Sequence, residues 1–102
     1  MTCRINPCVA GLVLYQFGSD SCAPCHAIRR RIEAWLPAHP GVRYQYLSLE
    51  EHPEEAAQNE VFSVPALLLY AEGKLVLREC GYFSVDAVLE KAIHYEQLLS
   101  QA

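Results

Sequence analysis

Two cysteines separated by two residues, Cys22 and Cys25, carry the clearest chemistry in this 102-residue sequence. Such a pair can close a small disulfide ring, so one thiolate can attack a disulfide and the other can resolve the product. The pair follows an apolar run, residues 12–17, and precedes a helical pattern, residues 27–36, with Gly18 at the turn. A helix beginning near Cys22 directs free N–H groups and its positive dipole end at that sulfur, which favours the nucleophilic thiolate. We therefore interpret the pair as a redox centre in which Cys22 attacks and Cys25 resolves.

The composition argues for one compact domain and against binding to nucleic acid or membranes. Hydrophobic residues make up 52% of the chain and charged residues 20%, which suits a single domain spanning residues 1–102. The net charge of −4 gives no electrostatic basis for binding nucleic acid or an anionic membrane. No stretch approaches the ~18 apolar residues of a membrane span, and no cleavage pattern precedes the dithiol. We expect a cytoplasmic monomer that binds neither nucleic acid nor membranes.

Three further cysteines, Cys3, Cys8 and Cys80, bring the total to five. An odd number leaves one thiol unpaired in an oxidised monomer, which fits a reducing compartment better than a secreted scaffold. Cys3 and Cys8 lie in an irregular N-terminal arm, residues 1–11, where we expect free thiols. Cys80 is expected to be a small buried residue in a strand, and a third redox-active thiol is the alternative. A zinc site would need a second close pair of ligands, which the sequence lacks, so no metal is expected.

The rest of the chain alternates strand and helix patterns. In order, the patterns predict a strand over 12–17, a helix over 27–36, a strand over 42–49, a helix over 50–59, a hairpin of strands over 66–70 and 74–79, and a helix after Ser84. Two strands joined through a helix should be parallel, and the hairpin adds two antiparallel strands. The predicted fold class is α/β, with a mixed four-stranded sheet and helices on both faces. A short strand at Thr2 to Ile5 would add a fifth.

This element order, with Cys22-Ala23-Pro24-Cys25 after the first buried strand, resembles the thioredoxin family over residues 12–100. Val64-Pro65 precedes an apolar strand, where the family has a cis-proline packed against its active-site disulfide. Gly81 matches the glycine that ends the last strand. The resemblance implies that Val64, Pro65 and Gly81 form a substrate groove beside the dithiol. About 11 residues precede the first strand, too few for the family's usual leading strand and helix, so the element count is closer to that of glutaredoxin.

The sequence departs from the family around the dithiol. Ser21 stands where the family usually has tryptophan, and Tyr46 aligns with a family lysine. Gln16 stands where the family has a buried acid, thought to accept the proton of the resolving cysteine, and an amide cannot accept it. His26 is the candidate for a replacement base, or else an ordinary helix residue, while a carboxylate at Asp20 would oppose thiolate formation. The residues expected to tune the dithiol are Gln16, Asp20, Ser21, Ala23, Pro24 and His26.

The resemblance also implies a function. It is that of a thiol–disulfide oxidoreductase that reduces the disulfides of client proteins and holds no bound cofactor. The dithiol would then be re-reduced by an NADPH-dependent thioredoxin reductase or by glutathione. Two alternatives stay open: a thioredoxin-fold adaptor with weak redox activity, and an oxidant or isomerase in an oxidising compartment.

Overall fold

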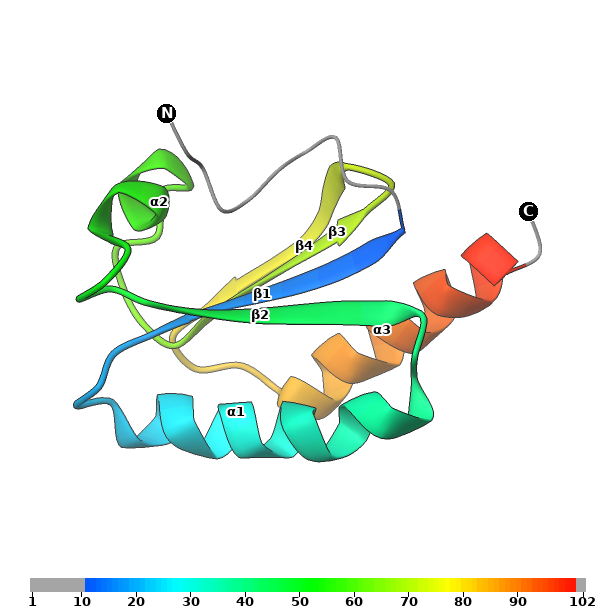
Figure 1. Ribbon diagram of the computed structural model, residues 1–102, viewed down its shortest axis with the longest axis horizontal. Helices are drawn as coiled ribbons and strands as arrows, with labels where there is room; N and C mark the ends of the chain where they lie inside the picture. The colour runs from blue at the N-terminus through cyan, green and yellow to red at the C-terminus, as the bar shows by residue number, and fades with distance from the viewer. Residues whose placement is uncertain (1–10, 101–102) are drawn as a thin grey trace.

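The computed structural model describes residues 11–100, which form a mixed four-stranded sheet with helices on both faces (Figure 1). The elements are β1 (Leu12–Gly18), α1 (Ala23–Trp35), the 3-10 helix η1 (Leu36–Ala38), β2 (Val42–Ser48), α2 (Pro53–Gln58), β3 (Ala66–Ala71), β4 (Lys74–Cys80) and α3 (Val85–Ser100). The strand order is β2-β1-β3-β4, and only β1 and β2 run parallel. This architecture confirms the predicted fold class. The strand predicted at Thr2 to Ile5 lies outside the described residues, as do Cys3, Cys8 and all of the predicted arm except Gly11.

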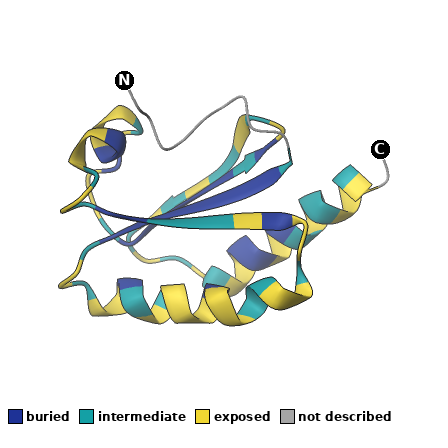
Figure 2. Cartoon of the chain, in the orientation of Figure 1, coloured by how far each residue is buried: buried dark blue, intermediate teal, exposed yellow. Residues whose placement is uncertain are grey.

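β1 is the central strand, and all seven of its residues are buried (Figure 2). A strand that is covered on both faces needs apolar side chains at nearly every position, which explains the continuous apolar run in the sequence. Near its end, Phe17 pairs with Leu47 of β2 and with Ala66 of β3. The end of β1, from which the segment leading to the dithiol departs, is therefore held by a neighbouring strand on each side.

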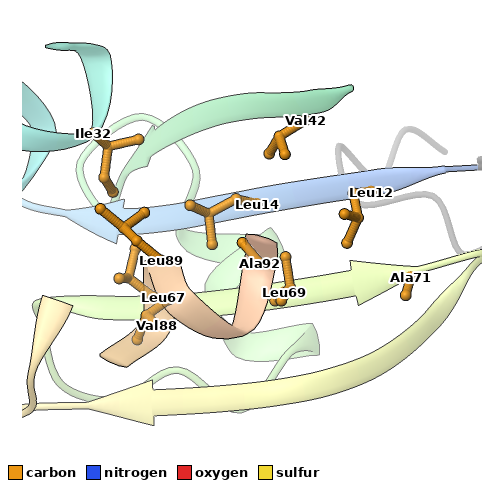
Figure 3. Close-up of a cluster of buried hydrophobic side chains, with 10 residues drawn as sticks. All are labelled: Leu12, Leu14, Ile32, Val42, Leu67, Leu69, Ala71, Val88, Leu89 and Ala92. Carbon is orange, nitrogen blue, oxygen red and sulfur yellow. The ribbon is translucent and has the colours of Figure 1, made fainter. Parts of the chain in front are cut away.

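α1 and α3 cover one face of the sheet (Figure 1). The helix predicted over residues 27–36 is confirmed, because its apolar stripe of Ile28, Ile32 and Trp35 in α1 and Leu36 in η1 packs against this face, with Ile32 fully buried. Figure 3 shows the cluster of buried side chains between the layers. It consists of Leu12, Leu14, Ile32, Val42, Leu67, Leu69, Ala71, Val88, Leu89 and Ala92. This packing holds α1, the helix that contains Cys25, against the sheet.

The short helix α2 lies on the opposite face (Figure 1), where Ala56 joins a second buried cluster with Phe17 and Leu47. The helix begins at Pro53, later than the predicted start at Glu50. Proline suits this position because the first N–H groups of a helix have no partner within it. Glu50 is consequently part of the turn before α2. No helix between residues 11 and 100 is long and apolar enough to cross a membrane.

β4 is an edge strand, and none of its seven residues is buried. Cys80, its last residue, pairs with Ala66 and is an exposed free thiol. The prediction that Cys80 is buried is therefore wrong. An edge strand has only one neighbour, and its end receives no cover from α3, which begins five residues later at Val85.

Candidate redox site

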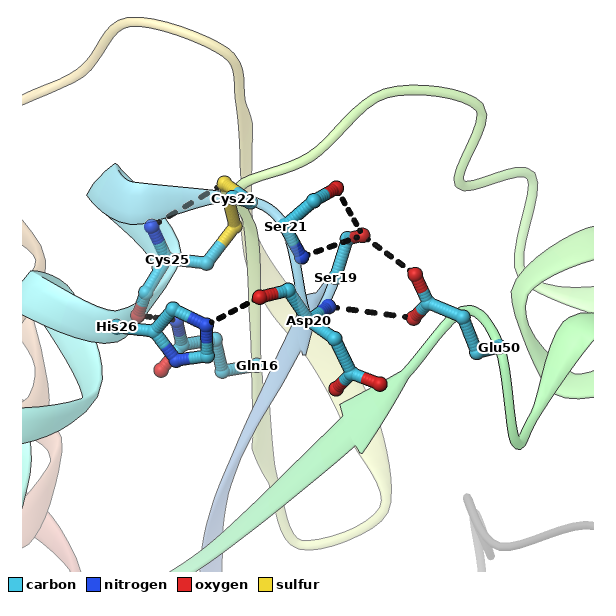
Figure 4. The surroundings of a disulfide bond; sticks show 8 residues. All are labelled: Gln16, Ser19, Asp20, Ser21, Cys22, Cys25, His26 and Glu50. Carbon is cyan, nitrogen blue, oxygen red and sulfur yellow. Dashed lines mark hydrogen bonds between the residues drawn. A yellow bond between two sulfur atoms is a disulfide. The ribbon is translucent and has the colours of Figure 1, made fainter.

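Cys22 and Cys25 form a disulfide at the N-terminus of α1, with their Cα atoms 5.2 Å apart (Figure 4). Cys22 is the N-cap of the helix, and its sulfur accepts a 3.2 Å hydrogen bond from the N–H of Cys25. Cys25 is completely buried, whereas Cys22 is partly exposed. In the reduced protein, the same N–H group and the helix dipole would favour a thiolate on the Cys22 sulfur. The two sulfurs therefore differ in access as the sequence predicted.

A groove of about 470 Å³ opens beside Cys22. It is lined by Cys22, Pro24, Ala27, Ile28, Val64, Pro65, Gly81, Tyr82, Phe83 and Val85. The Val64–Pro65 peptide bond is cis, as the family resemblance implied. Gly81 donates a 2.9 Å hydrogen bond from its N–H to the carbonyl of Pro65, and its positive φ of 81° favours glycine. The structure thus brings the predicted groove residues together with the dithiol.

Tyr82 lies on the rim of this groove and is fully exposed, at 106% of the reference accessibility. Its side chain is therefore accessible to any molecule that enters the groove beside Cys22. The sequence analysis did not identify Tyr82. The one feature of the sequence that could have identified Tyr82 as a groove residue is its position directly after Gly81.

Gln16 lies beneath the disulfide and is completely buried. Its Nε2 donates a 2.9 Å hydrogen bond to the carbonyl of Cys25. The hydroxyl of Tyr44 donates a 2.5 Å hydrogen bond to Gln16 Oε1. Burial raises the pKa of Tyr44 above its usual range, so this hydroxyl keeps its proton at neutral pH. A neutral pair therefore supports the dithiol, and the sequence analysis missed its second member, which is two residues before the Tyr46 that it singled out.

Tyr46 packs its ring against the end of β1. A Cβ atom at Gly18 would lie 2.2 Å from the Tyr46 hydroxyl oxygen, so only glycine fits there without a shift. The guanidinium of Arg29 lies 4.4 Å from the centre of the Tyr46 ring on another side. The buried hydroxyl of Tyr46 has no hydrogen-bond partner among residues 11–100. Tyr46 thus contributes packing at the position that aligns with the family lysine.

The loop before Cys22 is fastened to Glu50 (Figure 4). The carboxylate of Glu50 accepts a 2.6 Å hydrogen bond from the Ser19 hydroxyl and a 3.3 Å bond from the N–H of Asp20. The hydrogen bond from Ser19 holds the pKa of Glu50 below its ordinary value. The N–H of Ser21 donates to the Ser19 oxygen at 3.4 Å. Glu50 was also missed, although it follows β2 as the dithiol follows β1, and the carboxyl ends of parallel strands meet at one edge of the sheet.

The other residues expected to tune the site surround the dithiol without binding its sulfurs. The Nε2 atom of His26 forms a 2.9 Å hydrogen bond with the carbonyl of Asp20, and no hydrogen bond within residues 11–100 joins its ring to either sulfur. Figure 4 shows the Asp20 carboxylate directed away from the disulfide. Ala23 and Pro24 are the exposed first residues of α1. Within the same described range, no three His, Cys, Asp or Glu side chains are grouped so that they could hold a metal ion.

A disulfide within the first turn of a helix that follows a buried strand, with a cis-proline and a glycine lining a groove beside it, defines a class of dithiol–disulfide exchange proteins. Comparison with known proteins gives the family. The thioredoxin family model matches residues 6–94. The chain is 32% identical over 81 residues to a thioredoxin of Chlamydia trachomatis, which covers 79% of each chain. It is 34% identical over 82 residues to thioredoxin-1 of Saccharomyces cerevisiae, covering 80% of this chain and 78% of the yeast protein.

A solved thioredoxin structure from Nicotiana alata has the same fold, with a TM-score of 0.79 at 23% identity over 88% of this chain and 77% of that one. The chain belongs to the thioredoxin family. It is a thiol–disulfide oxidoreductase that reduces protein disulfides through Cys22 and Cys25, and the family works through a redox-active disulfide without a bound cofactor. The family and function inferred from the sequence are thereby confirmed.

Proposed function

We propose that Cys22 is the sulfur that attacks client disulfides and that Cys25 resolves the mixed disulfide. The observation that carries this assignment is the difference in access, because Cys22 opens onto the groove while Cys25 is 0% exposed. The Cys22 thiolate bonds to one client sulfur, and the second client sulfur leaves with the electron pair of the broken bond. Cys25 then bonds to Cys22 and displaces the first client sulfur. Two electrons pass to the client, and the dithiol becomes the disulfide.

Val64, Pro65 and Gly81 are proposed to hold the backbone of the client beside Cys22. The groove they share with Cys22 supports this role, since its lining is mostly apolar and is open on the side of the exposed sulfur. A client segment that lies there would place its disulfide within reach of Cys22 without moving β3 or β4.

We further propose a cytoplasmic, monomeric protein in which residues 1–102 form one domain. Its partners would be client proteins that contain disulfides, and an NADPH-dependent thioredoxin reductase, or glutathione, would return it to the dithiol form. The odd number of cysteines supports a reducing compartment.

Trapping of the mixed disulfide tests the two roles. With a disulfide-containing protein as substrate, Cys25→Ser should accumulate a covalent complex through Cys22 that dithiothreitol releases, and Cys22→Ser should form none. Cys80→Ser is the matched control and should reduce the substrate at the wild-type rate. Activity that survives in Cys22→Ser, or a complex formed through another cysteine, would contradict the assignment. An adaptor without redox function would bind and leave no covalent complex.

The direction of exchange is tested by the reduction potential of the Cys22–Cys25 pair. A cytoplasmic reductant should have a potential near the value of about −270 mV known for such proteins, and a strong oxidant near about −120 mV. Equilibration with glutathione at fixed ratios measures it. A value at the oxidising end would replace the proposed role with that of an oxidant.

A further inference from the structure

Both polar atoms of the buried Gln16 amide form hydrogen bonds. A carbonyl oxygen can only accept a hydrogen bond, so the NH₂ group of Gln16 must face the carbonyl of Cys25, at 2.9 Å. The amide oxygen then faces Tyr44, whose hydroxyl donates to it at 2.5 Å. The carbonyl of Cys25 therefore sets which way the amide points, and Tyr44 holds the other end of the amide in place through its oxygen.

We propose that Tyr44 is a positioning residue for the resolving step, acting through Gln16 to hold the backbone of Cys25 where its sulfur can attack Cys22, without supplying a base. The proposal rests on the roles of Cys22 and Cys25 in the proposed function. It assigns a task to a side chain on β2 that touches neither sulfur nor client.

The Gln16–Tyr44 pair that supports Cys25 is uncharged, and this determines where the proton of Cys25 goes. An amide has no basic atom, and the raised pKa of Tyr44 keeps its hydroxyl protonated. The thiol of Cys25 must therefore give its proton to hydroxide or water. Its thiolate forms the bond to Cys22 Sγ while the bond from Cys22 to the client sulfur breaks. The client sulfur leaves with that electron pair and is protonated by solvent, so atoms and electrons balance.

The titratable groups around this support are engaged elsewhere. From α1, Arg29 pairs with Glu33 at 3.2 Å and also lies over the ring of Tyr46 of β2. Also from α1, His26 is bonded to the carbonyl of Asp20. The charged side chains of the loop and of the turn after β2 are those of Asp20, Glu50 and Glu51. Within residues 11–100, none of these groups makes a hydrogen bond to the sulfur of Cys25.

Two-phase kinetics with an aromatic disulfide that releases a coloured thiolate at each step test the proposal. Cys3, Cys8 and Cys80 are replaced by serine, so that the first release reports attack by Cys22 and the second reports attack by Cys25. Tyr44→Phe should slow the second release several-fold and leave the first unchanged. Tyr46→Phe is the matched control, since that hydroxyl has no partner, and it should change neither.

The pH profile separates positioning from proton transfer. In the parent protein, the second release should rise about tenfold per pH unit between about pH 6 and 8, because it follows the thiolate fraction of Cys25. Tyr44→Phe should keep that slope at a lower rate, whereas Gln16→Asp should level off once its carboxylate is ionised and can take the proton. Should Tyr44→Phe fail to fold, Gln16→Leu removes the same support and should slow the second release selectively.

Three results would overturn the inference. They are a second release that Tyr44→Phe leaves unchanged, equal slowing of both releases, and a parent rate that does not depend on pH. A parent protein that gives no second release at all would instead overturn the proposed role of Cys25.

Discussion

The carboxylate of Glu50 accepts a 2.6 Å hydrogen bond from the hydroxyl of Ser19, a residue 31 positions earlier in the chain. This contact joins the loop that leads into Cys22 to the turn that follows β2. The bond lowers the pKa of Glu50, so the carboxylate stays ionised further into acid than an ordinary glutamate. The position of the nucleophile loop therefore depends on a charged group that the dithiol motif itself does not contain.

Replacing Glu50 by Gln should destabilise the protein near neutral pH and have no effect in acid. The folded-state pKa of Glu50 lies below its ordinary value of 4.5, so the stabilisation is present above that pH and is lost as the pH falls through the folded value. Urea unfolding at about pH 7 and about pH 3 measures the difference. Glu51→Gln is the control, since that exposed carboxylate makes no hydrogen bond within residues 11–100. Equal destabilisation at both pH values would contradict the prediction.

Gly18→Ala should destabilise the protein by about 1–3 kcal/mol, because the added methyl group overlaps the ring and hydroxyl of Tyr46. In a Tyr46→Ala background the ring is gone, and the same substitution should cost much less. Denaturant unfolding of the two single variants and the double variant measures the coupling. Additive effects would show that the two residues do not meet.

Ile32→Ala should lower the free energy of unfolding by about 2–5 kcal/mol, since Ile32 is the fully buried aliphatic side chain of α1. Ala34→Gly on the exposed side of the same helix should cost about 1 kcal/mol, the intrinsic helix penalty of glycine. Thermal and denaturant unfolding compare the two. Similar losses would mean that packing of Ile32 contributes little to holding α1 on the sheet.

Tyr82→Ala should lower kcat/KM for a protein disulfide by roughly fivefold, because a buried aromatic contact with a partner contributes about 1 kcal/mol or more. Reduction of a small-molecule disulfide should be unchanged, as such a substrate does not reach the rim. Leu98→Ala removes another exposed apolar side chain, at 47% exposure on α3, and should affect neither reaction. An equal loss for both substrates would assign Tyr82 to the structure of the site instead of to client binding.

The sequence was sufficient for the features that depend on local pattern. Residues 12–17 predicted a buried strand because both faces of β1 are covered, and the stripe ending at Trp35 predicted α1 because one face of the helix meets the sheet. Pro65 and Gly81 were identified through the family resemblance, and the structure shows a cis peptide bond at the first and a positive φ at the second.

Features that depend on pairing between distant segments could not be predicted in this way. Tyr44 donates a hydrogen bond to Gln16, but the family resemblance drew attention only to Tyr46, two residues further along β2. Glu50 was assigned to a helix start because its local sequence is acidic, while its contact with Ser19 exists only once β1 and β2 are side by side. The exposure of Cys80 follows from its place at the end of an edge strand, which apolar pattern alone does not reveal.

The groove beside the dithiol also has a consequence for protein synthesis. A nascent chain presents Cys22 and Cys25 long before it contains Pro65 and Gly81, whose hydrogen bond joins the far side of the groove. Until residue 81 has left the ribosome, the hydrogen bond between Gly81 and Pro65 cannot form, and the lining of the groove is incomplete. The groove beside the dithiol is therefore completed late in translation, and a chain truncated before Gly81 would keep the thiols of the motif without a complete groove.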